Sequence, residues 1–206
     1  MTDSEISRRR PGRPRSFDEA TVLRAATRLF WRDGYGGASM PEISAVTGLS
    51  TSSLYNAYGS KLDLLVAALD HYSDTVLDRY MLGPLRRGTD GLGDVDAFLD
   101  RLGATIDAEQ PRGCLAVNMI AEFREPAPSV AARTERYRRQ LRDGLHAALS
   151  RAGGLGEIPA DAADRRADAL VPIVVAFNLL VAAGAPAAET RHLLSAARDL
   201  AHGGVP

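Results

Sequence analysis

The sequence has few of the residues on which crosslinked or catalytic proteins depend. Cys114 is the only cysteine among 206 residues, so no disulfide can form within the chain, and a reducing cytoplasm is the expected setting. Neither a phosphate-binding glycine loop nor a nucleophile elbow is present. The histidines are scattered over three predicted helices without metal-binding spacing, at His71, His146, His192 and His202. We therefore expect neither an enzyme nor a bound metal or cofactor.

Lysine is also nearly absent, since Lys61 is the only one among 25 basic residues. Charge is spread unevenly along the chain: residues 1–61 carry 9 basic and 6 acidic side chains, and the remainder carries 16 and 20. The N-terminal part is therefore net positive, although the whole chain has a formal charge of -1. Cations that displace counterions from duplex DNA supply sequence-independent affinity, so this asymmetry permits a DNA-binding N-terminal part.

Residues 1–15 lack hydrophobic periodicity and contain two prolines and five arginines, which predicts a disordered arginine-rich arm. The first 30 residues lack the apolar segment of a secretory signal peptide. The stretch around Arg13 and Arg15 resembles the core of an AT-hook, which would place both side chains in a narrow minor groove. A solvated tail and a general attraction to phosphates are the alternative interpretations.

Hydrophobic spacing predicts three helices between residues 16 and 61. Gly34 ends the first, and two short helices over about 40–47 and 51–57 are joined by Gly48-Leu49-Ser50, a turn of the length found in helix-turn-helix motifs. Signals for helix starts place a hydroxyl where free amides need an acceptor. They occur at Ser16 with Glu19, Ser39 with Glu42, Ser50, and Ser60 with Asp63.

The rest of the chain also predicts helices. One begins at Lys61 and runs for about 20 residues until Gly83-Pro84 ends it. Others are expected near 94–109, 112–125, 128–152, 161–184 and 187–202. No segment alternates like a β-strand, and no internal repeat is present. The predicted fold is all-α with about nine helices: a helix-turn-helix domain over 16–61, and a larger C-terminal domain over 62–206.

One pattern of apolar residues, glycines and short motifs extends over about 50 residues. It comprises Leu29-Phe30, Gly34-Tyr35, Ile43, Gly48-Leu49-Ser50, Leu54-Tyr55, Tyr58, Ser60-Lys61 and Leu64-Leu65. This pattern resembles the DNA-binding domain of TetR-family repressors. The resemblance implies a three-helix DNA-binding domain, an effector-binding helical domain, and a homodimer formed largely by the last two helices. Ala57 departs from the pattern, because many relatives carry a histidine there that contacts a phosphate.

In a helix-turn-helix the second helix enters the major groove. Base contacts are therefore expected from Thr51, Ser52 and Asn56. Phosphate contacts are expected from Ser53, Tyr55 and Lys61, the last at a helix N-terminus where free amides also attract anions. Packing for Tyr55 and simple solvation for Lys61 are the alternatives. The full set of candidate DNA contacts is Arg13, Arg15, Ser39, Thr51, Ser52, Ser53, Tyr55, Asn56 and Lys61.

The middle helices carry the side chains for a ligand pocket, which needs apolar walls and a few polar groups. An ordinary core is the alternative for each of them. Cys114 begins a predicted helix, where a thiol ionises more easily and could sense oxidants or electrophiles, or it is simply a small buried hydrophobe. The pocket candidates are Phe98, Leu102, Cys114, Asn118, Met119, Phe123, Tyr137, Leu141 and Phe177.

Residues 169–188 are 20 uncharged positions, the length of a membrane span. Pro172, Asn178, Gly184 and Pro186 interrupt them, so we expect no membrane contact but a buried helix at a subunit interface. With the last helix it would form a four-helix dimer contact. The interface candidates are Phe177, Leu180, Val181, Leu193, Leu194 and Ala197.

The sequence thus predicts a cytoplasmic, homodimeric DNA-binding regulator. A repressor released from a palindromic operator by an apolar or amphipathic small molecule fits these features. An architectural DNA-binding protein that needs no effector is the alternative. The two differ in their specificity for one operator over random DNA.

Overall fold

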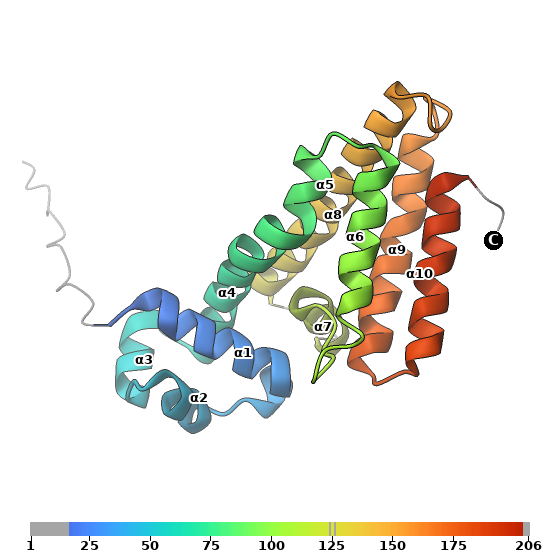
Figure 1. Ribbon diagram of the computed structural model, residues 1–206. Helices are drawn as coiled ribbons and strands as arrows, with labels where there is room; N and C mark the ends of the chain where they lie inside the picture. The colour runs from blue at the N-terminus through green and yellow to red at the C-terminus, as the bar shows by residue number, and fades with distance from the viewer. Residues whose placement is uncertain (1–16, 124, 126, 204–206) are drawn as a thin grey trace, which may run out of the picture.

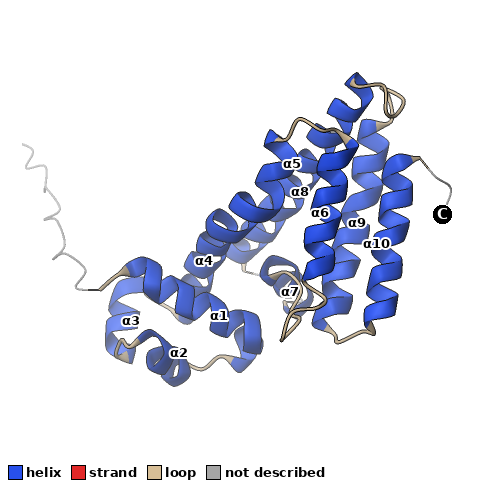
Figure 2. Cartoon of the chain, viewed as in Figure 1, coloured by secondary structure: helices blue, strands red, loops and turns tan. Residues whose placement is uncertain are grey.

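The computed structural model describes residues 17–123, 125 and 127–203. Every regular element in these ranges is a helix (Figure 2). Three helices form a small domain at one end of the molecule, and the remainder form a tilted bundle beside it (Figure 1). Because α4, η1 and α5 follow one another without a break, the described part of the chain holds nine separate helical rods. The predicted all-α fold is confirmed.

The small domain consists of α1 (Glu19–Gly37), α2 (Met40–Thr47) and α3 (Thr51–Tyr58). Ser39 and Glu42 form the predicted capping box at α2, and Ser50 caps α3. The start of α1 differs from the prediction: Ser16 lies outside the described residues, and the Asp18 side chain accepts the hydrogen bond from the Ala20 amide. Asp18 is therefore the N-cap residue of α1, whereas the sequence pattern assigned this role to Ser16, two residues earlier.

The end of α1 contains a sharp kink at Gly34, whose φ of 72° and ψ of 177° lie outside the helical region. Only glycine adopts this combination without a steric penalty, because it has no β-carbon. The predicted stop is therefore correct in position, although one more helical turn follows it. The kink points the backbone amides of Tyr35 and Gly36 away from the helix axis and makes them available to another element.

The helix that starts at Lys61 is longer than predicted. It runs through α4 (Lys61–Tyr72), the π-helical segment η1 (Ser73–Leu82) and α5 (Gly83–Arg87). The expectation that Gly83-Pro84 would end it is wrong. Gly83 has helical angles, and Pro84 lies at the start of α5, where the rod changes from π-helical to α-helical geometry. The result is one rod that extends from the small domain into the bundle.

The bundle is completed by α6 (Leu92–Ala104), α7 (Leu115–Glu122), α8 (Pro128–Gly154), α9 (Ala163–Ala182) and α10 (Ala187–His202). The helices predicted over 94–109 and 112–125 are shorter than expected, because residues 105–114 form a loop. Gly113 sits in this loop at a φ of 62°, where a β-carbon would collide with the Asn178 carbonyl. Within the described ranges no helix is both long and apolar enough to cross a membrane.

A charged contact holds the long rod against the bundle. The Asp70 carboxylate of α4 accepts hydrogen bonds from Arg133 at 2.9 Å and from Arg136 at 2.8 Å, both on α8. Asp70 and Arg133 are each about one-third exposed, so solvent screens this ion pair. The pair therefore contributes more to the orientation of α4 than to the stability of the fold. It fixes which face of α4 meets the bundle.

The kink yields a stability prediction with a matched control. Gly34→Ala should lower the free energy of unfolding by ~1–3 kcal/mol, because alanine cannot adopt this backbone conformation without strain. Gly154→Ala, at the end of α8 with open space around the new methyl group, should instead raise it by ~0.4–1 kcal/mol. Urea unfolding at one fixed protein concentration compares the two. Equal effects from both variants would contradict the strain at Gly34.

Candidate nucleic-acid interface and ligand cavity

Several hydrogen bonds hold the turn between α2 and α3. Gly48 caps α2 in the left-handed conformation with a φ of 71°. The Ser44 hydroxyl donates to the Leu49 carbonyl at 2.6 Å, and the Thr47 hydroxyl donates to the Ile43 carbonyl at 2.7 Å. These polar groups therefore fix the angle between the two helices locally.

Helix α3 presents its polar residues away from the core. Leu54 points inward and is 1% exposed, whereas Tyr55 is 46% exposed. Ser52 and Asn56 are also exposed, and Thr51 and Ser53 are half-buried. The five residues predicted to contact DNA from this helix are thus at least partly accessible.

The cap hydroxyl of Ser50 organises the start of α3. It accepts from the Ser53 amide at 3.1 Å and lies 2.9 Å from the Ser52 hydroxyl and 2.8 Å from the Ser53 hydroxyl. Ser39 plays the same part for α2: its hydroxyl donates to the Glu42 carboxylate at 2.6 Å. Ser39, Ser52 and Ser53 therefore already have partners within the protein, which orient them for any further contact.

Lys61 occupies the first position of α4, as predicted. Its ammonium lies 4.4 Å from the centre of the Tyr35 ring, a cation–π contact that restricts where the charge can move. Residues 40–58 include no basic side chain, and their one acid, Glu42, has its pKa lowered by hydrogen bonds from Ser39. The predicted contacts Arg13 and Arg15 lie outside the described residues.

Four contacts join the end of α1 to the bundle. The Glu122 carboxylate of α7 accepts from the Tyr35 amide at 2.9 Å and from the Gly36 amide at 2.6 Å. The Tyr35 ring lies 5.1 Å from that of Phe123. The Trp31 indole donates to the Arg112 carbonyl at 3.3 Å. We call this set the α1–α7 junction, and it connects the DNA-binding domain directly to the C-terminal bundle.

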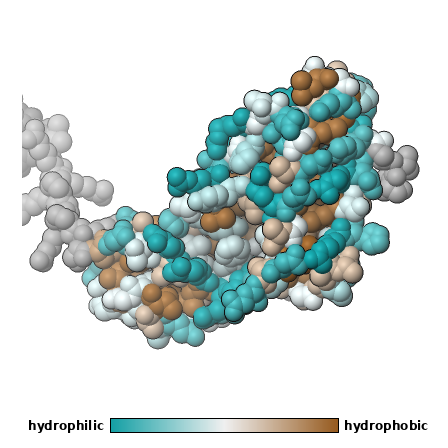
Figure 3. Space-filling view, in the orientation of Figure 1, coloured by the Kyte–Doolittle hydropathy of each residue, from teal (hydrophilic) through white to brown (hydrophobic). Residues whose placement is uncertain are grey.

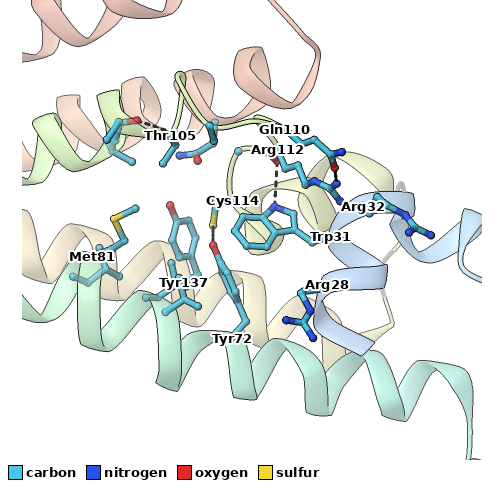
Figure 4. A pocket seen from close by; sticks show the side chains of 18 of the residues that line it. Arg28, Trp31, Arg32, Tyr72, Met81, Thr105, Gln110, Arg112, Cys114 and Tyr137 are labelled. Atoms are coloured by element: carbon cyan, nitrogen blue, oxygen red, sulfur yellow. Dashed lines mark hydrogen bonds between the residues drawn. The ribbon is translucent and has the colours of Figure 1, made fainter. Parts of the chain in front are cut away.

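A cavity of about 860 Å³ lies beside this junction. On the face seen in Figure 3, hydrophobic residues show within the hollow between the small domain and the bundle, bordered by hydrophilic ones. Side chains of both domains line the cavity, and Figure 4 shows how they face one another across it. The lining includes Arg28, Trp31, Arg32, Val46, Tyr72, Met81, Phe98, Leu102, Thr105, Gln110, Arg112, Cys114, Tyr137 and Asn178.

Four of the predicted pocket residues line this cavity: Phe98, Leu102, Cys114 and Tyr137. The other five are placed elsewhere. Asn118 donates to the Arg112 carbonyl at 2.9 Å, and Phe123 packs on Tyr35. The side chains packed into the core instead are Met119, Leu141 and Phe177.

Sequence reasoning missed the contribution of the first helix to the cavity. Arg28, Trp31 and Arg32 belong to α1, a helix from which no pocket candidate was predicted. Tyr72 of α4 was not a pocket candidate either, and its ring lies 5.2 Å from that of Trp31. No local pattern separates a residue that packs from one that faces a cavity between two domains.

Cys114 is buried in the cavity wall, where its sulfur accepts a hydrogen bond from the Tyr72 hydroxyl at 3.6 Å. Burial raises the pKa of the thiol above its ordinary value, and burial likewise raises the pKa of Tyr72. The N-terminal position on α7 therefore does not produce an ionised thiol. Of the two interpretations of Cys114, this environment favours the small buried hydrophobe.

The predicted dimer face is only partly accessible. Leu180 and Leu193 are half-buried and remain available to a second subunit. The other four candidates are buried within the protomer and support the face from beneath: Phe177, Val181, Leu194 and Ala197. Pro172, Ala176 and Ala183 are exposed along α9 and were not among the candidates.

A helix-turn-helix domain joined to a helical bundle is the architecture of a class of DNA-binding transcriptional regulators. Comparison with known proteins agrees. Residues 22–68 match the family described as bacterial regulatory proteins, tetR family. In the described residues no group of three metal-ligating side chains comes together.

Relatives extend the match well beyond the DNA-binding domain. The chain is 31% identical to the uncharacterized HTH-type transcriptional regulator YezE of Bacillus subtilis over 153 residues, which is 74% of this chain and 79% of that protein. It is 28% identical to the HTH-type transcriptional repressor ComR of Escherichia coli over 163 residues, covering 77% and 76% of the two chains. The chain belongs to the TetR family and is a DNA-binding transcriptional regulator, not an enzyme.

The fold is likewise shared with solved structures. A cysteine mutant of the TetR family regulator CifR, complexed with 26-base-pair operator DNA, superimposes with a TM-score of 0.75 at 27% identity. The match covers 90% of this chain and 98% of that one. The predicted family and fold class are therefore confirmed.

The environment of Cys114 predicts its reactivity. In the native protein at pH 7.5 the thiol should react with a disulfide reagent at least ~10-fold more slowly than in urea-unfolded protein, because it is buried and protonated. The pKa of the Cys114 thiol is higher in the folded protein than in the unfolded one, so keeping the thiol protonated stabilises the fold. This stabilisation is complete below the ordinary thiol pKa and is lost as the pH rises through the pKa of the folded protein. Absorbance of the released thiol measures the rate, and Cys114→Ala gives the blank. Rapid native reaction at neutral pH would contradict the assignment.

Proposed function

We propose that the protein is a homodimeric repressor that leaves a palindromic operator when a small molecule occupies the cavity. The observation that carries this proposal is the shared lining of the cavity. Arg28 and Trp31 come from the DNA-binding domain, while Phe98 and Tyr137 come from the bundle. A ligand that contacts both domains binds differently when their relative orientation changes, which is the condition for coupling to DNA affinity. The cytoplasm, where operator DNA lies, is the proposed location.

The DNA contacts are divided between two kinds of residue. Thr51, Ser52 and Asn56 contact base edges, and Ser53, Tyr55 and Lys61 contact phosphates, with Ser39 at the edge of the interface. Residues 40–58 contain no cation, and Ala57 offers no polar group where many relatives have a histidine. Most of the attraction for phosphates therefore has to come from Lys61 and from the arm that holds Arg13 and Arg15.

The second subunit packs on the outer face of α9 and α10. Apolar residues recur along α9 at Pro172, Ala176 and Leu180, and Leu193 continues the face onto α10. A two-fold axis there forms a four-helix contact and sets two α3 helices at the spacing of successive major grooves, ~34 Å apart. The half-sites of a palindrome are then read together.

Release works through the α1–α7 junction. Cys114 and Arg112 line the cavity and lie directly before α7, and Glu122 at the other end of α7 holds the kinked end of α1. A ligand that displaces the 105–114 loop therefore moves α7 and loosens the two amide contacts of Glu122. The DNA-binding domain then turns relative to the same domain of the second subunit, and the two α3 helices lose the spacing of successive major grooves.

Operator binding tests the proposed DNA interface. A gel shift with the DNA upstream of the protein's own gene should show a specific complex, which candidate small molecules weaken. Tyr55→Phe combined with Lys61→Ala should reduce binding to all DNA, by about 10-fold, and flatten the salt dependence. Thr51→Ala and Asn56→Ala should instead change which base pairs are preferred.

Two results would count against this assignment. A uniform loss from all of these substitutions would remove the division between base and phosphate contacts. Equal affinity for operator and random DNA, unaffected by any small molecule, would favour the architectural alternative.

The junction makes a separate prediction. Glu122→Ala removes the acceptor of two amide hydrogen bonds, so operator affinity without effector should fall by about 10-fold and the further effect of an effector should shrink. Glu125→Ala is the matched control, because Glu125 is exposed and carries the same charge three residues away. Fluorescence anisotropy of labelled operator DNA measures both. Indistinguishable behaviour of the two variants would show that the junction does not couple the domains.

A further inference from the structure

The charge of the cavity is one-sided. Its lining residues include three arginines, Arg28, Arg32 and Arg112, and neither an aspartate nor a glutamate. Solvation of a guanidinium at the edge of a low-polarity cavity is incomplete, so an uncompensated positive charge there attracts an anion. The positive charge of the cavity lining therefore favours a negatively charged ligand.

The three arginines differ in how far they are neutralised. Arg32 donates two hydrogen bonds of 2.6 Å to the Asp33 carboxylate. Arg112 donates to the neutral side-chain amide of Gln110. Arg28 has no hydrogen bond or ion pair with any residue that the structure describes. The hydrogen bonds from Arg32 are the main cause of the lowered pKa of the Asp33 carboxyl, and the charge of Arg112 lowers that pKa to a smaller extent. Among the residues that the structure describes, Arg28 and Arg112 thus have no ion-pair partner.

The arginines also lie at one end of the cavity. Figure 4 shows Arg28 and Arg112 beside α1, while Met81 lies at the opposite end, with Tyr72 and Cys114 between them. The deep walls are apolar and buried, and they include Leu77, Leu82, Phe98 and Leu102. The cavity therefore offers an apolar interior and a cationic end.

The cationic end of the cavity is open to solvent. The exposed lining residues belong to α1, to α2, to the last residue of α6 or to the loop after it, and they are Arg28, Arg32, Val46, Ala104, Ala108 and Gln110. The opening therefore lies between α1 and the 105–114 loop. A ligand that enters apolar end first leaves its head at the rim, next to the arginines and in contact with water.

We infer that the effector is an anionic amphiphile, with its apolar body against Phe98 and Met81 and its carboxylate or phosphate group held by Arg28 and Arg112. Planar guanidinium groups bind both kinds of head through paired charge-assisted hydrogen bonds. This inference rests on the proposed effector-controlled function and names the class of effector. Because Arg28 belongs to the DNA-binding domain and Arg112 to the 105–114 loop of the bundle, the same anion contacts both domains at the rim and shifts the loop that carries Arg112.

Trp31 provides a direct measurement of binding. It is the only tryptophan of the chain and lines the cavity, so its fluorescence reports occupancy. The full-length protein is titrated with decanoate, decyl phosphate, decylamine and 1-decanol, each below its aggregation concentration. Decanoate or decyl phosphate should bind at least about 10-fold more tightly than decylamine and 1-decanol. The stronger of the two anions identifies the head group as carboxylate or phosphate.

Substitutions connect the selectivity to the named arginines. Arg28→Gln and Arg112→Gln should each weaken binding of the preferred anion by about 10-fold and leave 1-decanol unchanged. Arg24→Gln is the matched control: Arg24 lies one turn before Arg28 on α1, is exposed, and does not line the cavity. Retained 1-decanol binding also shows that each variant is folded.

The outcomes separate this inference from the proposed function. Failure of both anions to bind, equal affinity for decanoate and 1-decanol, or anion binding that ignores both substitutions would overturn the inference. The gel shift with other small molecules would then still test effector control. Arginine-dependent anion binding that leaves operator affinity unchanged would support the anionic ligand and refute the release mechanism.

Discussion

The continuous helix from Lys61 to Arg87 belongs to both domains, and the rest of the structure is arranged around it. Leu64 and Leu65 at its start are buried beneath α1, so this segment completes the core of the DNA-binding domain. Leu77 and Leu82 further along form a wall of the cavity. Because the rod has no break at Gly83-Pro84, the two domains cannot move independently of it, and a change in the cavity acts on the same element that supports the reader helix.

The second connection between the domains is polar, and its geometry explains why it can be released. Glu122 binds two backbone amides that are free only because Gly34 breaks the helical hydrogen-bond pattern. Such contacts are directional and lose most of their strength when the atoms separate slightly, whereas the apolar packing of α1 on α4 tolerates small shifts. The domains thus share one connection suited to stability and one suited to switching.

Local signals in the sequence predicted the local features well. The caps at Ser39, Ser50 and Ser60 depend on side chains within three residues, and all three helices begin where these signals place them. The prediction that a helix would end at Gly83-Pro84 failed because the surrounding rod overrides a weak local preference. The cavity lining was half missed for a related reason. Trp31 reaches it only through the packing of α1 against a loop some 80 positions away, which no periodicity records.

The lack of basic residues in α2 and α3 connects the DNA interface to the junction. In the proposed interface Lys61 is the main phosphate contact among the described residues. The Tyr35 ring beneath its ammonium sets the position of that charge. The Tyr35 amide in turn donates a hydrogen bond to the Glu122 carboxylate, and the Tyr35 ring packs on Phe123. A shift of α7 therefore acts on the phosphate contact directly, as well as through rotation of the whole domain. A DNA-binding surface with many cations would be insensitive to such a shift, whereas the proposed surface, which depends on Lys61 and the arginine arm for its attraction to phosphates, is more sensitive to it.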